Sequence, residues 1–319
     1  MAETIAVLGP GRIGRQIALA FALGGCRVRL LDVKEGRPAG EAARALADAR
    51  REIVRDVALM VEEHVIDEAE AAAVLGRIEE GIGIEALKGC GFVQEALPES
   101  VPLKQAALAR LDGYVDADAI VASGSSTISP SHVCDAVPGP ERFLVAHWLN
   151  PAHIIPLVDV VPCARTSPET VERTLALLER VGKTPVRCGD SPGFIGPRLQ
   201  VLLMNEAVRL VEEGVATPED VDRAFTAGMG FRYASIGIFE FIDWGGVDIL
   251  YRASRYMTEA LGDERFKPAR LVEEKMARNE LGPKTGRGFF DYAGDRREAF
   301  ETDKVRALLR RLRTERRRP

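Results

Sequence analysis

The 319-residue sequence lacks the features that would place it in a membrane or on a nucleic acid. No apolar run approaches the roughly 18 residues that a membrane-spanning helix needs. The sequence begins MAETIAVLGPG, without a basic region before an apolar core, so we expect no signal peptide. The net charge is −5, which excludes a bulk basic field that attracts nucleic acid or anionic lipid. With 46% hydrophobic and 29% charged residues, the composition predicts a soluble globular protein.

Cysteine is also scarce, and the few cysteines form no CxxC pair. Their odd number and wide spacing predict neither a disulfide framework nor a metal site, and they favour a reducing, cytoplasmic location. A reactive nucleophile among them is the alternative, but a free cysteine more often packs as a small buried hydrophobe. The five residues are Cys26, Cys90, Cys134, Cys163 and Cys188.

Strand-like and helix-like segments alternate through the first 188 residues, and this alternation predicts a parallel, doubly wound sheet. The expected strands include IAVL, RVRLL, GFVQEAL, AIVAS and TPVRC, with a long charged helical pattern from about residue 40 to 80. After GDSPG the strand signal disappears and helical patterns follow. We therefore expect an α/β fold, with a Rossmann-like domain at 1–188 and an all-α domain at 189–319.

The turn GPGRIG, residues 9–14, follows an apolar strand and opens an apolar-periodic helix. In such a turn Gly9 permits the tight bend, Gly11 lets the backbone approach a pyrophosphate, and Gly14 lets the helix pack on the strand. Asp32 ends the second strand, 18 residues past Gly14, where a carboxylate binds an adenosine ribose and repels a 2′-phosphate. The pattern predicts an NAD site; a glycine-rich turn that binds nothing is the alternative.

The stretch LVAHWLNPAHIIPLVDVVP, residues 144–162, contains two apolar runs that each carry one polar residue. The link between them is too short for a parallel crossover, so the runs should pair antiparallel. A register symmetric about His153 places His147 opposite Asp159, each six residues from the centre. An imidazole and a carboxylate at that separation form a general base and the group that orients it. The residues alone leave a core histidine bonded to a backbone carbonyl equally open.

Taken in order, these motifs resemble the 3-hydroxyacyl-CoA dehydrogenase family, including its lambda-crystallin/gulonate 3-dehydrogenase branch. The resemblance covers nearly the whole chain and rests on the following segments: GPGRIG, QEALPES, SGSSTI, AHWLNP, PLVDVV, SPGFIGPRL, MNEAVRLVEEGVAT, GFRYASIGIFEFIDWGG and GPKTGRGFFDY.

The resemblance implies roles for individual residues. His147 is expected to be the catalytic base, Asp159 its carboxylate partner, and Ser126 a catalytic residue that contacts substrate and nicotinamide. The expected cofactor contacts are Gly9, Gly11, Arg12, Ile13, Gly14, Asp32, Glu99, Lys104, Ser126, Asn150 and Lys284. Structural roles remain open for several of them, such as a turn residue at 150, a helix cap at 126 and a surface pair at 99 and 104.

Two departures from the family pattern concern the site. The family's usual partner for the histidine is glutamate, whereas this chain has the shorter Asp159. Pro197 stands where the family has an asparagine that touches the substrate oxygen. Proline suits the first turn of a helix, so the fold is safe while the substrate contact is lost. His153 is a candidate to supply a polar group in its place.

The expected activity is oxidation of a 3-hydroxyl of a short acyl-CoA by NAD, in fatty acid metabolism, with the site at the strands' carboxyl ends between the domains. The expected assembly is a homodimer through the helical domain. Arg44, Arg51 and Arg55 share a helical face that could bind CoA phosphates, but interleaved Asp48 and Glu52 also fit a salt-bridged surface helix. A free hydroxy acid, an aromatic alcohol or aldehyde, and a non-catalytic crystallin-like protein are the alternatives.

Overall fold

The computed structural model describes residues 3–315, and the chain divides into two compact units, Met1–Met204 and Asn205–Pro319. The bounds 1–188 and 189–319 follow the change in secondary structure and stay a prediction. Each unit is described by itself below.

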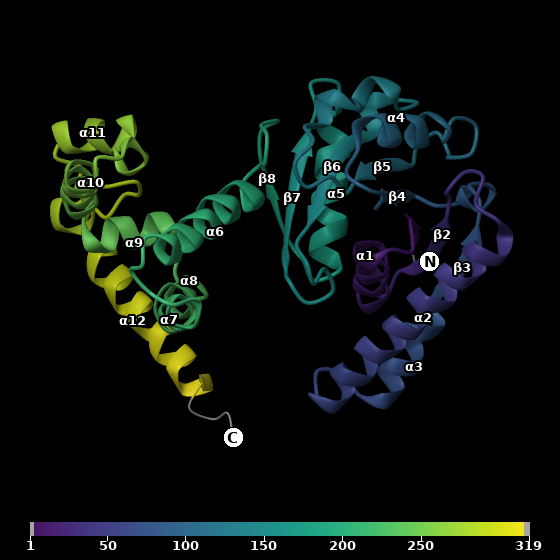
Figure 1. The fold of residues 1–319 in the computed structure, drawn as a ribbon, viewed down its shortest axis with the longest axis horizontal. Coiled ribbons are helices and arrows are strands. Elements are labelled where there is room, and N and C mark those ends of the chain that lie inside the picture. The colour runs from purple at the N-terminus through teal and green to yellow at the C-terminus, as the bar shows by residue number, and fades with distance from the viewer. Residues whose placement is uncertain (1–2, 316–319) are drawn as a thin grey trace. The chain divides into compact units, whose positions relative to one another are not determined.

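The first unit is built on a sheet with helices packed against it (Figure 1). Its strands are β1 (Thr4–Leu8), β2 (Arg27–Asp32), β3 (Ile78–Ile82), β4 (Phe92–Glu95), β5 (Ile120–Ser123), β6 (Phe143–Trp148), β7 (Leu157–Pro162) and β8 (Thr184–Arg187). Its helices are α1 (Arg12–Leu23), α2 (Ala39–Glu62), α3 (Glu68–Gly76), α4 (Val101–Ala109) and α5 (Pro168–Arg180), with short 3₁₀ turns at 85–87, 130–132, 134–136 and 140–142.

The strand order is β3-β2-β1-β4-β5-β6-β7-β8, and the pairs are parallel except for β6 with β7. The chain winds outward from β1 through β2 to β3, then returns to β4 on the other side of β1. This reversal confirms the doubly wound fold and opens a crevice at the carboxyl ends of β1 and β4, where such folds bind ligands.

Two apolar layers cover the sheet and fix the positions of those strand ends. One layer packs α1, α2, α3 and α5 against one face, with Phe21 and Ile53 fully buried among the side chains of β1, β2 and β4. The other packs α4 and the 3₁₀ turns against the opposite face, around Leu87 and Leu108. Both faces are buried, as a parallel sheet requires.

Side-chain caps mark the starts of two helices in this unit. Ser167 caps α5 by accepting a hydrogen bond from the Thr170 amide, with Pro168 in the first turn. Asp67 and Glu70 form a capping box at the start of α3. The pattern over 40–80 predicts only helix, but the structure ends it near residue 76 and forms β3, whose charged residues Glu79 and Glu80 are exposed at the sheet edge.

The second unit is helical, as the sequence predicts. Its described elements are α6 (Gly196–Glu212, which begins in the first unit), α7 (Pro218–Ala224), a π-helix (Phe225–Gly230), α8 (Phe231–Tyr233), α9 (Ile238–Gly245), α10 (Val247–Leu261), a 3₁₀ turn (Glu264–Phe266), α11 (Arg270–Ala277), a second 3₁₀ turn (Pro283–Thr285) and α12 (Arg296–Glu315). Buried Asp243 organises the segment after α11, because its carboxylate accepts bonds from the Phe289 and Phe290 amides and the Tyr292 hydroxyl.

The cysteines correct one expectation. The structure joins Cys134 and Cys163 as a disulfide, with their Cα atoms 6.8 Å apart, because the 134–136 turn lies beside the end of β7. Cys26, Cys90 and Cys188 are free thiols. Burial raises the pKa of both Cys26 and Cys90, so these two thiols stay protonated. None of the helices within residues 3–315 is long and apolar enough to cross a membrane.

A matched pair of glycine substitutions tests the packing of α1. A Cβ at Gly14 would lie 1.9 Å from the Gly9 carbonyl oxygen, whereas a Cβ at Gly11 would meet no atom of the described residues within 4 Å. Gly14→Ala is expected to lower the free energy of unfolding by about 1–3 kcal/mol, the usual cost of overpacking. Gly11→Ala is expected to leave it within about 0.5 kcal/mol. Urea unfolding of both variants measures the difference, and equal stabilities would contradict the close approach of α1 to the turn.

Candidate active site

The turn after β1 is shaped to receive a phosphate group. Gly9 has φ +106°, donates its N–H to the Leu31 carbonyl at 2.8 Å, and leaves no room for a Cβ, which would lie 2.9 Å from the Ala96 oxygen. Gly11 occupies the N-cap of α1 without a side-chain cap, and the space beside its Cα is open within the described part of the chain. The first amides of α1 are therefore available to an anion at the positive end of the helix.

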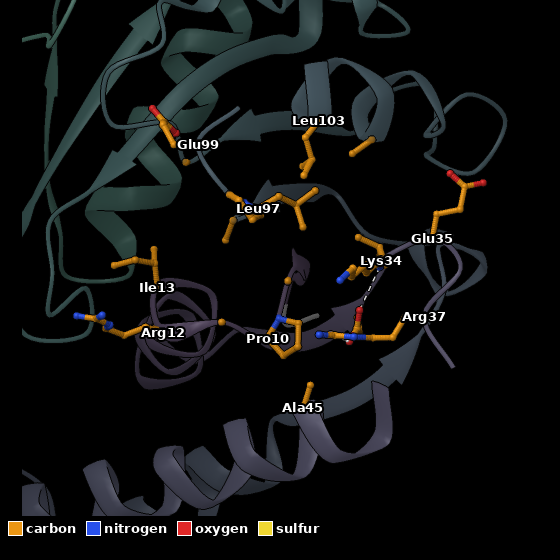
Figure 2. A pocket seen from close by; sticks show the side chains of 18 of the residues that line it. Pro10, Arg12, Ile13, Lys34, Glu35, Arg37, Ala45, Leu97, Glu99 and Leu103 are labelled. Atoms are coloured by element: carbon orange, nitrogen blue, oxygen red, sulfur yellow. Dashed lines mark hydrogen bonds and ion pairs between the residues drawn. The ribbon is translucent and has the colours of Figure 1, made fainter. Parts of the chain in front are cut away.

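A cavity of about 840 Å³ lies beside this turn, at the carboxyl ends of β1, β2, β4 and β5. Figure 2 shows Lys34, Glu35 and Arg37 at one end of it and Arg12, Ile13 and Glu99 at the other. The predicted cofactor residues that line it are Gly9, Gly11, Arg12, Ile13, Asp32, Glu99 and Ser126. Its size fits a dinucleotide, and so does its place beside β1 and β4, where the strand order reverses.

Asp32 ends β2 and is almost fully buried at the cavity wall. Its Oδ1 accepts the Lys34 amide at 3.1 Å, and its Oδ2 is paired with the Arg37 guanidinium. The carboxylate is thus fixed in place, with lone pairs left to accept hydroxyl groups.

Glu99 anchors the loop that carries Ser126. Its Oε1 accepts bonds from the Ser125 hydroxyl at 2.6 Å and from the amides of Ser126, Thr127 and Ile128 at 2.9–3.2 Å. Burial acts to raise the pKa of Glu99, but the bonds from Ser125 and the backbone outweigh it and hold the pKa below its ordinary value. The exposed Ser126 is thereby fixed at the cavity by an ionised carboxylate.

Lys104 is turned into the protein rather than toward solvent. Only 1% of it is exposed, and its Nζ contacts both oxygens of the buried Glu95 at 2.9 and 3.0 Å and the Leu97 carbonyl at 3.2 Å. The Ser123 hydroxyl and the Leu97 amide also donate to Glu95, both at 2.5 Å. This cluster joins the ends of β4 and β5, and the Lys104 ammonium reaches Glu99 at 3.6 Å.

The His147–Asp159 register is confirmed, since these residues are direct partners in the antiparallel pair of β6 and β7. His147 Nδ1 lies 3.0 Å from Asp159 Oδ2, and the two side chains are 7% and 0% exposed. The shorter aspartate therefore reaches the imidazole without a bridging group. With Nδ1–H donating to the carboxylate, Nε2 is the ring nitrogen left to accept a proton.

The surroundings of Asp159 are close and largely apolar. A Cβ at Gly196, the first residue of α6, would lie 3.0 Å from Asp159 Oδ2, so glycine there admits the carboxylate. Asp159 Oδ1 accepts no hydrogen bond from the described residues, and the Phe194 ring lies 6.1 Å from the His147 ring. Burial and the Asp159 charge raise the pKa of the Cys188 thiol to about 11, which excludes a thiolate nucleophile there.

The other predicted residues of the first unit are His153, Pro197 and Asn150. The charged groups that act on His153 are Asp56 of α2, Arg15 of α1 and Lys183. Burial is the main cause that lowers the pKa of His153. Nothing in these contacts points His153 to a substrate, so we do not assign it there. Pro197 is buried in the first turn of α6, and Asn150 is exposed.

Lys284 belongs to the second unit, where its ammonium is paired with Asp248. The hydrogen bond from Lys284 is the largest of the effects that lower the pKa of Asp248. The predicted contact of Lys284 with NAD stays a prediction.

Sequence reasoning missed three residues that shape the site: Glu95, Arg37 and Gly196. Glu95 is the acid within QEAL at the end of a strand, a signal that was available. Arg37 follows Asp32 in a loop whose path no periodicity defines. Gly196 became significant only when α6 was placed against Asp159.

Comparison with known proteins matches both parts of the chain to one family. Residues 4–191 fit the model of the 3-hydroxyacyl-CoA dehydrogenase NAD-binding domain, and residues 193–292 fit the model of the C-terminal domain of the same enzymes. The chain belongs to the 3-hydroxyacyl-CoA dehydrogenase family. The resemblance found in the sequence motifs is thereby confirmed, and the protein is an NAD-dependent oxidoreductase of this family.

Relatives within the family differ in their named activities. The chain is 34% identical to the 5-formyl-3-hydroxy-2-methylpyridine 4-carboxylate 5-dehydrogenase of Mesorhizobium japonicum, over 97% of each chain. It is 36% identical to the lambda-crystallin of Oryctolagus cuniculus, over 80% of this chain and 78% of that one. The crystal structure of a 3-hydroxyacyl-CoA dehydrogenase from Archaeoglobus fulgidus matches with a TM-score of 0.76, 32% identity and 98% coverage of both chains. The family is clear, and the substrate differs among its members.

Glu99→Gln is expected to loosen the Ser126 loop, because a neutral amide oxygen is a weaker acceptor than the carboxylate for the bonds that Glu99 Oε1 receives. Hydrogen exchange of the amides of Ser126, Thr127 and Ile128 measures this, and we expect faster exchange in the variant. The lowered pKa of Glu99 gives a direction in pH: protection is present above the ordinary carboxyl pKa and is lost as the pH falls through the lower, folded-state value. Protection factors, taken relative to the intrinsic exchange rate at each pH, that are independent of both the substitution and pH would contradict the anchoring role.

Proposed function

We propose that this protein oxidises the 3-hydroxyl of a short acyl-CoA, such as 3-hydroxybutyryl-CoA, to the 3-keto form with NAD. The observation that carries the proposal is the His147–Asp159 pair, held at 3.0 Å on the sheet whose carboxyl edge also bears the dinucleotide-shaped cavity. A buried imidazole with one nitrogen fixed by a carboxylate is suited to accept a hydroxyl proton.

In this reaction His147 Nε2 takes the proton from the substrate hydroxyl. The Asp159 carboxylate, 3.0 Å from Nδ1, stabilises the imidazolium that results. NAD supplies the acceptor for the hydride that leaves carbon 3. Ser126, held by Glu99, donates its hydroxyl to the substrate oxygen as carbonyl character develops.

The residues of the cavity fit NAD. The open space at Gly11 and the uncapped start of α1 accept the pyrophosphate, and Asp32 accepts the ribose hydroxyls. Glu99 and Asn150 are proposed to contact NAD, as the family resemblance implies. Lys104 has an indirect role: its ammonium holds Glu95 and the turn at Leu97 in place.

The ion pairs on α2 and the residue at position 197 favour a second substrate class. Arg51 is paired with Asp48 at 2.6 Å and Arg55 with Glu52 at 3.0 Å, so these cations already have partners and are less available to CoA phosphates. Pro197 also removes the family's asparagine donor. These features suit a small free acid, and the 34% identical relative is named as a dehydrogenase of a pyridine carboxylate. The second candidate is therefore an aromatic alcohol or aldehyde that carries a carboxylate.

The homodimer is part of the same proposal. Large apolar side chains on α6, α10 and α9 are exposed in the single chain, among them Leu202, Met204, Val208, Phe239 and Tyr256. An apolar surface of this kind is typical of a subunit interface.

His147→Gln is expected to lower kcat by about 10²–10⁴-fold, the contribution of a positioned general base. NADH binding should be unchanged, because His147 does not line the cavity. Stopped-flow absorbance of NADH with the best substrate measures kcat, and NADH fluorescence measures binding. A variant with near-normal kcat would remove His147 from the mechanism.

A substrate screen with NAD separates the two candidates. For a 3-hydroxyacyl-CoA dehydrogenase, kcat/KM for 3-hydroxybutyryl-CoA exceeds that for free 3-hydroxybutyrate and for aromatic aldehydes that bear a carboxylate. The reverse order assigns the protein to the second class. Arg44→Ala is the companion variant: it should raise KM for the CoA substrate if the exposed Arg44 binds a CoA phosphate, and leave a free acid unaffected.

A further inference from the structure

We propose that Lys34, Arg37 and Arg110 form a latent 2′-phosphate subsite at the adenosine end of the cofactor cavity, and that Asp32 alone keeps NADP out of it. The inference rests on the proposed placement of NAD and adds residues that decide cofactor specificity. All four side chains belong to residues that line the same cavity.

Arg37 is the central residue of this subsite. It follows the β2 end by five residues and its side chain, 26% exposed, is paired with Asp32 Oδ2. Its Nε is buried and finds no hydrogen-bond partner among the described residues. An arginine at this position is suited to form charge-assisted hydrogen bonds with phosphate oxygens.

Two further cations stand beside Arg37. Lys34 is exposed, and Figure 2 shows it on the same side of the cavity as Arg37. The Arg110 guanidinium donates to the Val33 carbonyl at 3.3 Å and reaches the largely exposed Glu35 only at 3.8 Å. This end of the cavity therefore has three cations and two carboxylates, those of Asp32 and Glu35. Of the two carboxylates, only that of Asp32 is both buried and at the proposed ribose position.

This arrangement separates two effects that Asp32 combines. Its carboxylate accepts the ribose hydroxyls of NAD and repels a 2′-phosphate at the same point. The Arg37 pairing neutralises part of that repulsion and fixes the carboxylate. Removing the charge of Asp32 while keeping its shape leaves Arg37, Lys34 and Arg110 facing the place where a 2′-phosphate lies.

The test measures binding and needs no substrate. Dissociation constants for NADH and NADPH are determined by dihydronicotinamide fluorescence, and those for AMP and 2′,5′-ADP by competition. The variants are Asp32→Asn, Arg37→Ala and the double variant. Arg27→Ala is the matched control, since it removes an exposed cation from the other end of β2. Asp32→Ser provides a second neutral residue at position 32.

The unmodified protein is expected to bind NADH more tightly than NADPH. Asp32→Asn and Asp32→Ser should tighten NADPH and 2′,5′-ADP binding by about 10- to 100-fold, the range of one charge-assisted hydrogen bond. Arg37→Ala in the Asp32→Asn background should abolish most of that gain, and Arg27→Ala should change nothing. NADH binding retained by each variant shows that it is folded.

Two results would overturn the inference. One is an Asp32→Asn variant that binds NADH and gains no affinity for NADPH. The other is a gain that survives in the double variant, which would show that Arg37 does not hold the phosphate. An unmodified protein that binds neither NADH nor AMP would instead reject the cofactor placement itself, so the two failures are distinguishable.

Discussion

The antiparallel pairing of β6 with β7 is the constraint on which the candidate site depends. β1, β4, β5 and β6 are parallel neighbours, so the glycine turn, the Glu99 segment, the Ser126 loop and His147 are all brought to the carboxyl edge of one sheet. Because β7 reverses direction, a residue early in that strand falls opposite one late in β6. In this register Asp159 lies directly opposite His147, which places a carboxylate beside the imidazole.

Two further carboxylates organise the polar groups near that edge. Glu95 is buried with Lys104 and Ser123 and joins β4 to β5, while Glu99 gathers the amides that follow β5. A buried ion pair adds little net stability by comparison with apolar packing, but loss of one partner leaves an uncompensated charge. Such pairs therefore fix geometry, and here they fix the loop that presents Ser126.

Periodicity and motif order predicted the sheet, the helical second part, the glycine turn and the His147–Asp159 register. Those features depend on local patterns that repeat over many residues or on symmetry within one hairpin. Periodicity failed at β3, because two exposed glutamates in an edge strand resemble the polar surface of a helix.

Lys104 and Cys134 show the limit of sequence reasoning most plainly. A lysine near a motif suggests a surface cation, and only the packing of α4 shows that it lies inside with Glu95. The Cys134–Cys163 contact joins segments whose proximity depends on the whole sheet. His153 is close in sequence to the base, yet the charges that act on it belong to Asp56, Lys183 and Arg15.

The most direct test of the base assignment is the tautomer of His147 in the NADH-bound protein. Nitrogen-15 NMR of histidine-labelled protein resolves the two ring nitrogens, and the spectrum of a variant without His147 assigns its signals among the four histidines. We predict that the neutral ring carries its proton on Nδ1, donated to Asp159, with Nε2 unprotonated. A neutral ring protonated on Nε2, with Nδ1 bare, would contradict the role of His147 as the base.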